Sequence, residues 1–249
     1  MNSPIIELKA VTKSFGPVNV LKGVDFAAHA GRVTALVGDN GAGKSTLIKG
    51  LAGVQPYDGG EVLFAGEPVQ LGHPRDASKH GIEVVYQDLA LCDNLDIVQN
   101  MFLGREEVRV GTFEEGRMEV EAAAALQSLS VRTVKSLRQK VASLSGGQRQ
   151  TVAIARAVVK QSKVVILDEP TAALGVAQTA QVLSLVRRLA DHGVAVIMIS
   201  HNLADVFEVA DDVSVLYLGE MTARLPVAET TRDDVVAYIT GTKRMERVA

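Results

Sequence analysis

The hydrophobic pattern of this chain predicts two kinds of strand. Near the N-terminus, short stretches partly alternate apolar and polar side chains and are separated by glycine-containing turns, which is typical of antiparallel strands. These stretches are residues 5–11, 24–28 and 61–65. Other stretches are apolar at almost every position, as in parallel strands that are covered on both faces. They are residues 33–37, 84–86, 164–167 and 194–199.

Helical patterns occupy much of the chain between these strands. A helix is expected over Ser45–Leu51, ending at Gly53, and the pattern between Gln87 and Leu144 is helical, including Glu119–Leu129 with its run of alanines. The elements expected after His201 are one more strand, 213–218, and a short helix, 232–239. Together they predict an α/β fold with a mainly parallel sheet, a small antiparallel β layer and a helical insert.

Composition fits an ordinary globular protein. Hydrophobic residues make up 47% of its 249 residues, enough for a large core, and the net charge of −3 gives no support for nucleic acid as a partner. The single cysteine, Cys92, cannot form an internal disulfide, which fits a reducing cytosol. We see no export signal and no stretch near the ~20 apolar residues of a membrane span. Any membrane span is therefore expected from another chain.

Residues 38–45, Gly-Asp-Asn-Gly-Ala-Gly-Lys-Ser, match the nucleotide-binding P-loop at every defined position. In such a loop the glycines let backbone N–H groups turn inward around phosphates, and the following helix offers its positive end. Lys44 is expected to reach the outer phosphates, and the Ser45 hydroxyl to hold Mg²⁺. The residues expected to contact nucleotide here are Gly38, Asn40, Gly41, Ala42, Gly43, Lys44, Ser45 and Thr46.

A second glycine motif, Leu144-Ser145-Gly146-Gly147-Gln148, leads directly into an amphipathic segment. Ser145 and Gln148 have the spacing of a capping box, so the motif predicts a helix start, and such a start is also an anion site. On a chain that already carries a P-loop, this pentapeptide resembles the signature of the ATP-binding-cassette (ABC) family. The resemblance implies a P-loop ATPase core with ATP and Mg²⁺ as ligands. The nucleotide contacts that it adds are Ser145, Gly146, Gly147 and Gln148.

Further polar candidates stand at the ends of the predicted parallel strands. Gln87 follows the strand at 84–86, and His201 follows the strand at 194–199. Asp168 and Glu169 close the strand at 164–167, while the P-loop follows the strand at 33–37. In open α/β sheets ligands bind beyond the carboxyl ends of the strands. These groups are therefore expected to converge on one nucleotide.

The resemblance gives the charged candidates their roles. Asp168 matches the Walker B position and is expected to hold Mg²⁺, directly or through a water. Glu169 resembles the catalytic glutamate that orients and polarises the attacking water, and His201 the switch histidine that hydrogen-bonds the terminal phosphate. With Lys44 they form the expected catalytic set. The alternatives are a cap of a helix or turn for Asp168 and a surface glutamate for Glu169.

Two more site residues rest on the resemblance. Gln87 corresponds to the Q-loop glutamine, whose amide ligates Mg²⁺ or positions water while the loop after it meets the membrane partner. Phe15 stands where the family places an aromatic residue that stacks on adenine, and stacking requires only a ring face. The alternative for Phe15 is a loop aromatic that covers the antiparallel layer.

The segment after Gln87 is unusually apolar. We expect part of it to form the core of the helical subdomain and part to form a groove that receives a helix of a permease. The pattern does not divide the two groups. The apolar positions are Leu89, Ala90, Leu91, Cys92, Leu95, Ile97, Val98, Met101 and Phe102.

One position departs from the family pattern. After Thr171-Ala172-Ala173-Leu174 the family normally has aspartate, and this chain has Gly175. Glycine is still an acceptable helix N-cap, so the fold is not threatened. Since the aspartate helps to shape the loop that crosses to the partner's site, the departure bears on communication between two sites.

The resemblance spans residues 5–241, which we expect to form a single ABC ATPase domain with a helical subdomain at about 88–160 and a tail at 242–249. Segments after Gln87 and around Gly175 look most like the ATPases of bacterial monosaccharide importers, of the ribose, xylose and fructose class. The expected partners are a second copy of the chain in an ATP-dependent homodimer, a membrane permease and, indirectly, a periplasmic or lipid-anchored sugar-binding protein. The expected location is the cytoplasmic face of the cell membrane.

Two alternatives stay open. One is the ATPase of an exporter, or of an importer of another solute, because the chemistry of ATP hydrolysis is the same. The other is a soluble cassette ATPase of DNA repair or translation. The segment between Gln87 and Leu144 lacks the heptads of a long coiled-coil insert, and the chain has one cassette and no basic extension, which disfavours this second class.

Overall fold

The computed structural model describes residues 3–131, 134 and 136–243, so most of the predicted C-terminal tail, residues 244–249, lies outside it. The central sheet has six strands in the order β12-β11-β3-β10-β9-β6. Every neighbouring pair is parallel except β11 and β12. The strands are β3 (Val33–Val37), β6 (Ile82–Val85), β9 (Val164–Asp168), β10 (Ala195–Ile199), β11 (Asp212–Tyr217) and β12 (Glu220–Pro226). The predicted mainly parallel sheet is confirmed.

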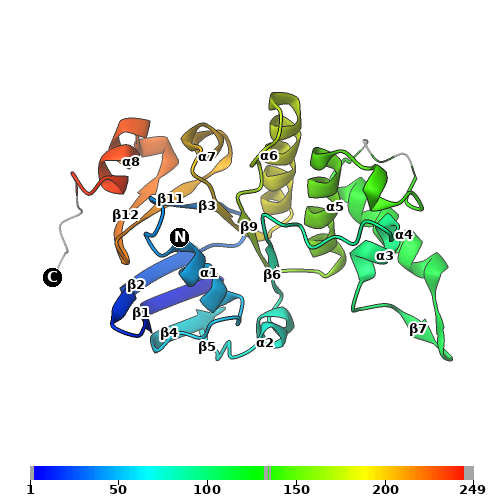
Figure 1. Ribbon diagram of the computed structural model, residues 1–249, viewed down its shortest axis with the longest axis horizontal. Helices are drawn as coiled ribbons and strands as arrows, with labels where there is room; N and C mark the ends of the chain where they lie inside the picture. Colours follow the sequence, from blue (N-terminus) through cyan, green and yellow to red (C-terminus); the bar gives the residue numbers. More distant parts are fainter. Residues whose placement is uncertain (1–2, 132–133, 135, 244–249) are drawn as a thin grey trace.

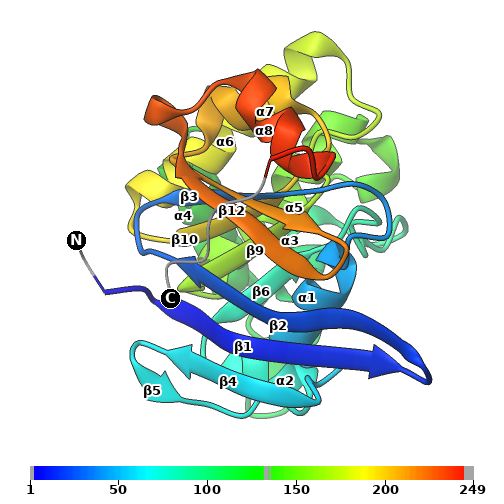
Figure 2. The same ribbon diagram turned by 90° about the vertical axis from the view of Figure 1, so that its left-hand side faces the viewer.

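A second, antiparallel sheet has the order β2-β1-β4-β5. Its strands are β1 (Ile6–Phe15), β2 (Val18–Ala28), β4 (Gly59–Phe64) and β5 (Glu67–Pro68). It lies on the opposite side of the central sheet from α6, α7 and α8 (Figure 2). The strands β1 and β2 are longer than the predicted stretches and form a hairpin in which Phe15 pairs with Val18 at the turn.

Eight α-helices and two short 3-10 turns complete the described part of the chain. The helices are α1 (Lys44–Leu51), α2 (Pro74–Lys79), α3 (Ile97–Phe102), α4 (Glu115–Ser128), α5 (Gly146–Val159), α6 (Val176–Asp191), α7 (Leu203–Val209) and α8 (Arg232–Ile239). The 3-10 turns are η1 (Val141–Ser143) and η2 (Val227–Glu229). Helices α3, α4 and α5 lie together at one end of the molecule (Figure 1). None of the helices described is long and apolar enough to cross a membrane.

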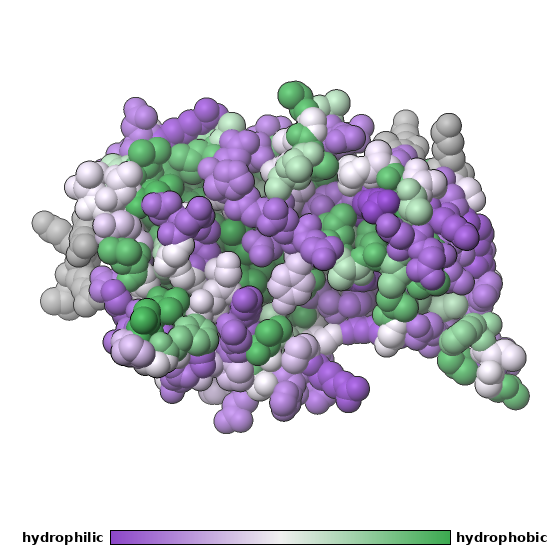
Figure 3. Space-filling view, in the orientation of Figure 1, coloured by the Kyte–Doolittle hydropathy of each residue, from purple (hydrophilic) through white to green (hydrophobic). Residues whose placement is uncertain are grey.

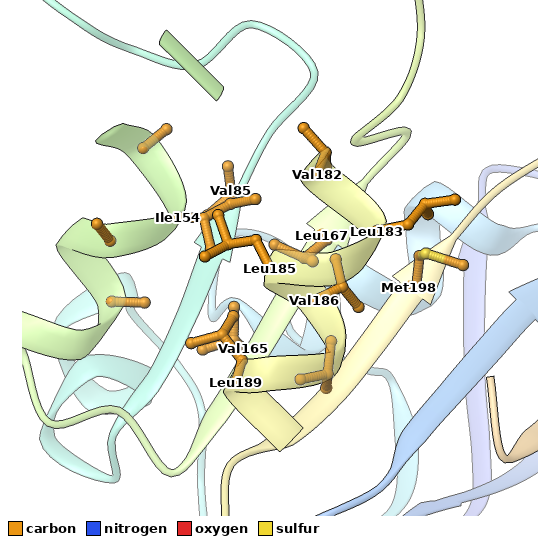
Figure 4. Packing of buried hydrophobic residues seen from close by; sticks show 14 of the residues in the cluster. Val85, Ile154, Val165, Leu167, Val182, Leu183, Leu185, Val186, Leu189 and Met198 are labelled. Carbon is orange, nitrogen blue, oxygen red and sulfur yellow. The ribbon is translucent and has the colours of Figure 1, made fainter. Parts of the chain in front are cut away.

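The central sheet separates two apolar clusters because successive side chains of a strand point to opposite faces. In β9, Val165 and Leu167 pack with the helices α3 to α8, whereas Val164 and Ile166 pack with α1, α2 and the antiparallel sheet. Figure 4 shows side chains of α5 and α6 meeting Val165 and Leu167. Full burial of each such aliphatic side chain contributes about 1.5–3 kcal/mol. Covering both faces leaves the carboxyl ends of the strands as the open edge.

Three hairpins were not predicted from the sequence. The segment predicted as helical contains β7 (Val108–Arg109) and β8 (Thr112–Phe113), a second strand, β12, follows β11, and β5 follows β4. All three hairpins turn on two left-handed residues: Val110-Gly111, Leu218-Gly219 and Ala65-Gly66. This turn normally carries asparagine or aspartate before glycine, so an aliphatic residue there conceals the signal. The β7–β8 hairpin projects from the molecule and carries exposed apolar side chains (Figures 1 and 3).

Candidate nucleotide site

The P-loop connects β3 to α1, and two of its glycines are required by space. A Cβ on Gly38 would lie 2.2 Å from the carbonyl oxygen of Leu216, and the φ of Gly38 is +154°. Gly43 is the N-cap of α1 with φ of +108°, and its Cβ would lie 3.0 Å from Leu21. No described side chain caps α1, so the N–H groups of its first turn face the loop without a competing oxygen.

Lys44 lies inside the curve of this loop. Its ammonium donates to the carbonyl oxygens of Gly38 at 2.6 Å and Asp39 at 3.0 Å. Burial lowers the pKa of Lys44, while the charges of Glu169, Asp39 and Asp168 act in the opposite direction. Glu169 and Asp168, at the end of β9, are therefore near enough to Lys44 for their charges to affect its pKa. An ammonium has three donors, and two are used by the loop.

Asp168 and Glu169 stand where β9 ends. Burial, and then the charge of Glu169, raise the pKa of Asp168. Glu169 adopts the left-handed conformation with φ of +50°, and its N–H donates to the carbonyl of Ile199 at 3.0 Å. A left-handed residue other than glycine costs roughly 1–3 kcal/mol, and such strain is concentrated at functional positions. The two adjacent carboxylates therefore belong to residues at the carboxyl end of β9.

His201 meets Glu169 across neighbouring strands. Nδ1 of His201 lies 2.7 Å from Oε2 of Glu169. The histidine side chain is 74% exposed and the glutamate side chain 18%. The carboxylate thus holds the ring at one nitrogen, while most of the histidine side chain stays exposed. A ring that bridges a carboxylate and a phosphate must donate from both nitrogens.

The strands that carry these residues are consecutive in the sheet: β3, β10, β9 and β6. The structure thus brings Lys44, Asp168, Glu169 and His201 together. Gln87 follows β6 at the end of this row and is exposed. Burial, and then the charge of Asp168, raise the pKa of Tyr86, so the end of β6 is also close enough to sense the Asp168 carboxylate.

A hydrogen-bonded chain behind the site joins the segments that follow β9 and β10. Thr171 Oγ1 donates to Oδ2 of Asp205 at 2.6 Å, and Asn202 Nδ2 donates to Oδ1 of the same carboxylate at 3.0 Å. Asp205 is 5% exposed. Asn202 also caps α7 by accepting from the N–H of Ala204. Sequence reasoning missed these residues, although an N-cap directly after His201 was a usable signal.

The second glycine motif starts α5 with a complete capping box. Ser145 Oγ accepts from the Gln148 N–H at 3.4 Å, and Gln148 Oε1 accepts from the Ser145 N–H at 2.9 Å. Gly147 is buried, and its Cβ would lie 3.1 Å from the side chain of Gln178 in α6. The motif is therefore packed against the start of α6. Its helix start is as predicted, whereas its nucleotide contacts stay a prediction.

Gly175 is the N-cap of α6 with an extended backbone. Gln178 Oε1 accepts from the Gly175 N–H at 3.4 Å, which is one half of a capping box. The other half requires a side-chain oxygen that glycine lacks. No described atom lies within 4 Å of a Cβ built on Gly175. The position therefore has room for the aspartate that is normal in the family.

Phe15 ends β1, and its side chain is 44% exposed. Lys13 Nζ lies 5.7 Å from the centre of its ring. The ring is not part of either apolar cluster among the described residues, and its stacking on adenine stays a prediction.

A family model described as ABC transporter matches residues 21–172 of this chain. The chain belongs to the ABC transporter family. It is one of the family's ATP-binding ATPases. The fructose import ATP-binding protein of Rhizobium meliloti is 43% identical to this cassette over 99% of the chain and 97% of that relative. The xylose/arabinose import ATP-binding protein of Sulfolobus acidocaldarius is also 43% identical, over 96% of the chain and 94% of the relative.

Longer relatives and solved cassettes agree. The ribose import ATP-binding protein of Yersinia pestis is 40% identical over 96% of this cassette, which spans 46% of that relative. A nucleotide-free ATP-binding cassette of an ABC transporter superimposes with a TM-score of 0.81 at 25% identity, covering 96% of both chains. A cassette in its ADP conformation gives 0.82 with the same identity and coverage. The predicted family and fold are confirmed.

Proposed function

We propose that this cassette is the ATP-hydrolysing subunit of an importer and supplies energy to a membrane permease that carries a sugar, in particular a monosaccharide. The relatives support this proposal, since they are ATP-binding proteins of fructose, xylose/arabinose and ribose import. The protein would act at the cytoplasmic face of the cell membrane, and residues 5–241 would form its single domain, with the helical subdomain at about 88–160.

The single observation that carries the catalytic proposal is the Glu169–His201 contact of 2.7 Å beside Lys44. Glu169 takes the proton of a water as its oxygen attacks the terminal phosphorus, and the bond to the bridging oxygen of ADP breaks. Lys44 and the backbone of the P-loop stabilise the negative charge of the phosphates. His201 donates Nε2–H to the terminal phosphate while Glu169 orients its ring.

Mg²⁺ would be held by Asp168 and Ser45, with Gln87 as a further oxygen ligand. The surroundings of Asp168 fit a ligand of Mg²⁺. Burial and the charge of Glu169 raise the pKa of Asp168, and a cation next to its carboxylate would offset both effects. In the described ranges, no group of three or more His, Cys, Asp or Glu side chains could hold a metal. Mg²⁺ characteristically binds to one or two carboxylates plus substrate phosphates, and it would neutralise the charge of the phosphates here.

The adenine base would stack on the exposed ring of Phe15. The remaining contacts to the nucleotide would come from the P-loop and, from a second copy, from the start of α5. A monomer covers one side of the nucleotide only, so the Ser145–Gln148 segment of the second copy would cover the terminal phosphate. Two such sites then lie across one two-fold interface.

The permease would dock on the apolar segment after β6. Ile97, Val98, Met101 and Phe102 are buried and belong to the core. Leu89, Leu91 and Cys92 are only partly buried, and Ala90 is exposed. The surface of Leu89–Cys92 is therefore our proposed contact with a helix of the permease. This division was not visible in the sequence.

The catalytic proposal is tested with Glu169→Gln, which keeps the size and hydrogen bonding of the side chain but removes the base. Steady-state ATP hydrolysis and ATP affinity are measured on the same preparation. We expect unchanged affinity and hydrolysis reduced by ~10²–10⁴-fold, as is typical for loss of general-base catalysis. Hydrolysis above about a tenth of the wild-type rate would reject Glu169 as the main catalytic carboxylate.

The assembly proposal is tested on the same Glu169→Gln protein. Sedimentation should show a dimer with ATP and mainly monomer without it. A monomer at saturating ATP would count against the head-to-tail dimer. Co-purification with a permease and with a sugar-binding protein separates the importer from an exporter cassette, which would bring a permease alone. A soluble repair or translation ATPase would bring neither.

A further inference from the structure

The turn Pro56–Asp58 lies between α1 and β4 and contacts two parts of the proposed nucleotide site. One is the helix that follows the P-loop, and the other is the end of β1 that carries Phe15. The turn holds none of the motifs that the sequence analysis assigned to the nucleotide site.

Asp58 holds the end of β1 through both its backbone and its side chain. Its N–H donates to the carbonyl of Thr12 at 2.9 Å. Its Oδ2 accepts from the Ser14 N–H at 2.7 Å, and its Oδ1 accepts from Lys13 Nζ at 2.7 Å. Lys13 Nζ also donates to the carbonyl of Pro56 at 2.7 Å. The backbone and the charged side chain that directly precede the aromatic residue are thereby fixed.

Tyr57 anchors the same turn on α1. Its hydroxyl donates to the carbonyl of Leu47 at 2.6 Å. Its ring fills the space beside Gly50, where a Cβ would lie 2.2 Å from the ring. Since α1 begins at Lys44, the turn connects the phosphate-binding helix to the end of β1 through two adjacent side chains.

The Phe15 ring is exposed on one side and bordered by Lys13 on another. A cation within about 6 Å of a ring centre is attracted to the face of the ring, and Lys13 Nζ lies at 5.7 Å. The Lys13 ammonium, and then the Ser14 N–H, hold the pKa of Asp58 below its usual value, so its carboxylate stays charged. Asp58 thus fixes the cation that in turn limits the orientations of the ring.

We propose that Asp58 is a positioning residue for adenine recognition, which holds the Lys13–Phe15 segment so that Phe15 presents its ring at a fixed distance from the P-loop. This inference rests on the proposed role of Phe15 in the nucleotide site. A preformed platform avoids the cost of ordering the segment when the ligand binds. The effect of Asp58 therefore appears only for ligands that contain a base.

The test compares ATP with inorganic triphosphate, which has the phosphates without the base. Affinities for both ligands, with Mg²⁺, are measured by calorimetry on the full chain. Asp58→Ala is expected to weaken ATP binding about tenfold, which lies in the range of losses seen when a base loses its aromatic stacking partner. The affinity for triphosphate should stay within about twofold, which also shows that the P-loop is folded. Phe15→Ala should reduce the preference for ATP by the same factor, and Phe15→Ala/Asp58→Ala should add little.

Two further variants make the test sharper. Asp58→Asn keeps an acceptor for the Ser14 N–H but removes the charge that holds Lys13, so we expect an intermediate loss of about threefold. Glu61→Ala removes an exposed carboxylate from the neighbouring strand β4 and should leave both affinities unchanged.

Two outcomes would overturn the inference in distinguishable ways. Equal loss of ATP and triphosphate affinity in Asp58→Ala would mean that the turn supports α1 in general and not the base. Unchanged ATP affinity in Asp58→Ala, together with a clear loss in Phe15→Ala, would remove Asp58 from recognition and leave Phe15 in place. If Phe15→Ala itself preserves the preference for ATP, the proposed adenine platform fails and the role of Asp58 fails with it.

Discussion

Helices α1 and α5 both start at a glycine motif, but they satisfy their first backbone donors in different ways. The start of α1 has Gly43 as N-cap and no side-chain cap among the described residues. The start of α5 is capped by Ser145, and Gln148 completes the box. Any helix leaves its first four N–H groups without partners inside the helix. In α1 these donors are available to a ligand, whereas in α5 one of them is already used.

This difference indicates which role each glycine motif can have within a single chain. The start of α1 would form part of the proposed phosphate site within one chain, with Lys44 inside the loop. The start of α5 is stable without any ligand, because its own side chains cap it. A serine hydroxyl that accepts one hydrogen bond can still donate its own proton. Ser145 could therefore keep its cap and donate to a phosphate held by a second copy.

The largest expected effect comes from the space around Gly38. In Gly38→Ala the new methyl group would lie 2.2 Å from the Leu216 carbonyl, and neither backbone can yield without moving the loop or β11. We expect ATP affinity to fall more than about 100-fold, which corresponds to losing roughly 2.7 kcal/mol of binding free energy. Calorimetric titration with ATP measures it.

Gly41→Ala is the matched control for this steric effect. Gly41 has φ of +80°, yet no described atom lies within 4 Å of its added Cβ. Its cost is therefore the left-handed strain of about 1–2 kcal/mol without a clash. If the two variants bind ATP equally, the close approach to Leu216 is not what shapes the loop.

Ser145→Ala tests the other helix start. Loss of the cap should cost about 1 kcal/mol, or roughly 2–4 °C in Tm for a chain of this size. ATP affinity of the monomer should be unchanged because the P-loop is intact. Hydrolysis should fall at least about tenfold if Ser145 also donates to the partner's nucleotide, since a lost transition-state contact of 1.4 kcal/mol is a factor of ten.

Thr231→Ala separates stability from catalysis. Thr231 caps α8 with the same capping-box geometry, accepting from the Asp234 N–H, at a helix that carries no motif residue. Thr231→Ala should lower Tm by about as much as Ser145→Ala does, and it should leave ATP hydrolysis unchanged. An equal loss of hydrolysis in both variants would show that Ser145 acts only as a cap.

Asp168→Asn tests how much the charge of Asp168, next to the P-loop, lowers the stability of the folded protein. The folded protein raises the pKa of Asp168, so the folded state binds this proton more readily than the unfolded state does. Wild-type stability therefore falls as the pH rises from about 3.8 through the raised pKa, and it stays lower above that range. The neutral variant should be the more stable protein at about pH 7, and the difference should vanish toward about pH 3.5.

Urea unfolding without nucleotide, repeated along this pH range, checks the Asp168 prediction. Stabilisation by Mg²⁺ and ATP should be smaller in the variant, because a proposed ligand of Mg²⁺ is lost. A variant that is less stable than wild type at neutral pH would contradict the argument. Asp168 would then be stabilising in the absence of the metal.

The sequence indicates the strand ends well because an apolar run followed by a polar residue is a local signal. Lys44, Asp168, Glu169 and His201 could be placed in this way, and the order β3-β10-β9-β6 makes their strands neighbours. Their roles stay predictions. The resemblance to the family rests on short motifs, each of which can be identified from consecutive residues alone.

The remaining features depend on contacts between distant segments. Thr171 and Asp205 are 34 residues apart, and Lys13 and Asp58 are 45 residues apart. No periodicity connects such pairs, since each depends on how two distant segments pack together. The left-handed Glu169 and the Val110-Gly111 turn were hidden for another reason, because glutamate and valine rarely adopt that conformation.

The smallest expected effect concerns the start of α6. This helix start has one half of a capping box, whereas α1 has no side-chain cap and α5 has a complete box. Gly175→Asp would supply the missing oxygen of the capping box into open space. Aspartate exceeds glycine as an N-cap by only a few tenths of a kcal/mol, so Tm should rise by about 1 °C. Gly175→Ala is the control: it adds a methyl group without an oxygen, and it should lower Tm because alanine is a poor N-cap.

The effect of Gly175→Asp on hydrolysis discriminates between two interpretations of the glycine. In a homodimer both copies carry Gly175 and both retain Lys44, Asp168, Glu169 and His201, so we expect two competent sites. An aspartate at this helix start could contact the opposite P-loop, which would change the cooperativity of ATP hydrolysis more than the turnover number. The competing interpretation is a degenerate ATPase that mainly binds nucleotide. The competing view would be established by a wild type that is inactive even with its permease and is rescued more than about tenfold by Gly175→Asp. A tenfold rescue means that about 1.36 kcal/mol of transition-state stabilisation depends on this one side chain.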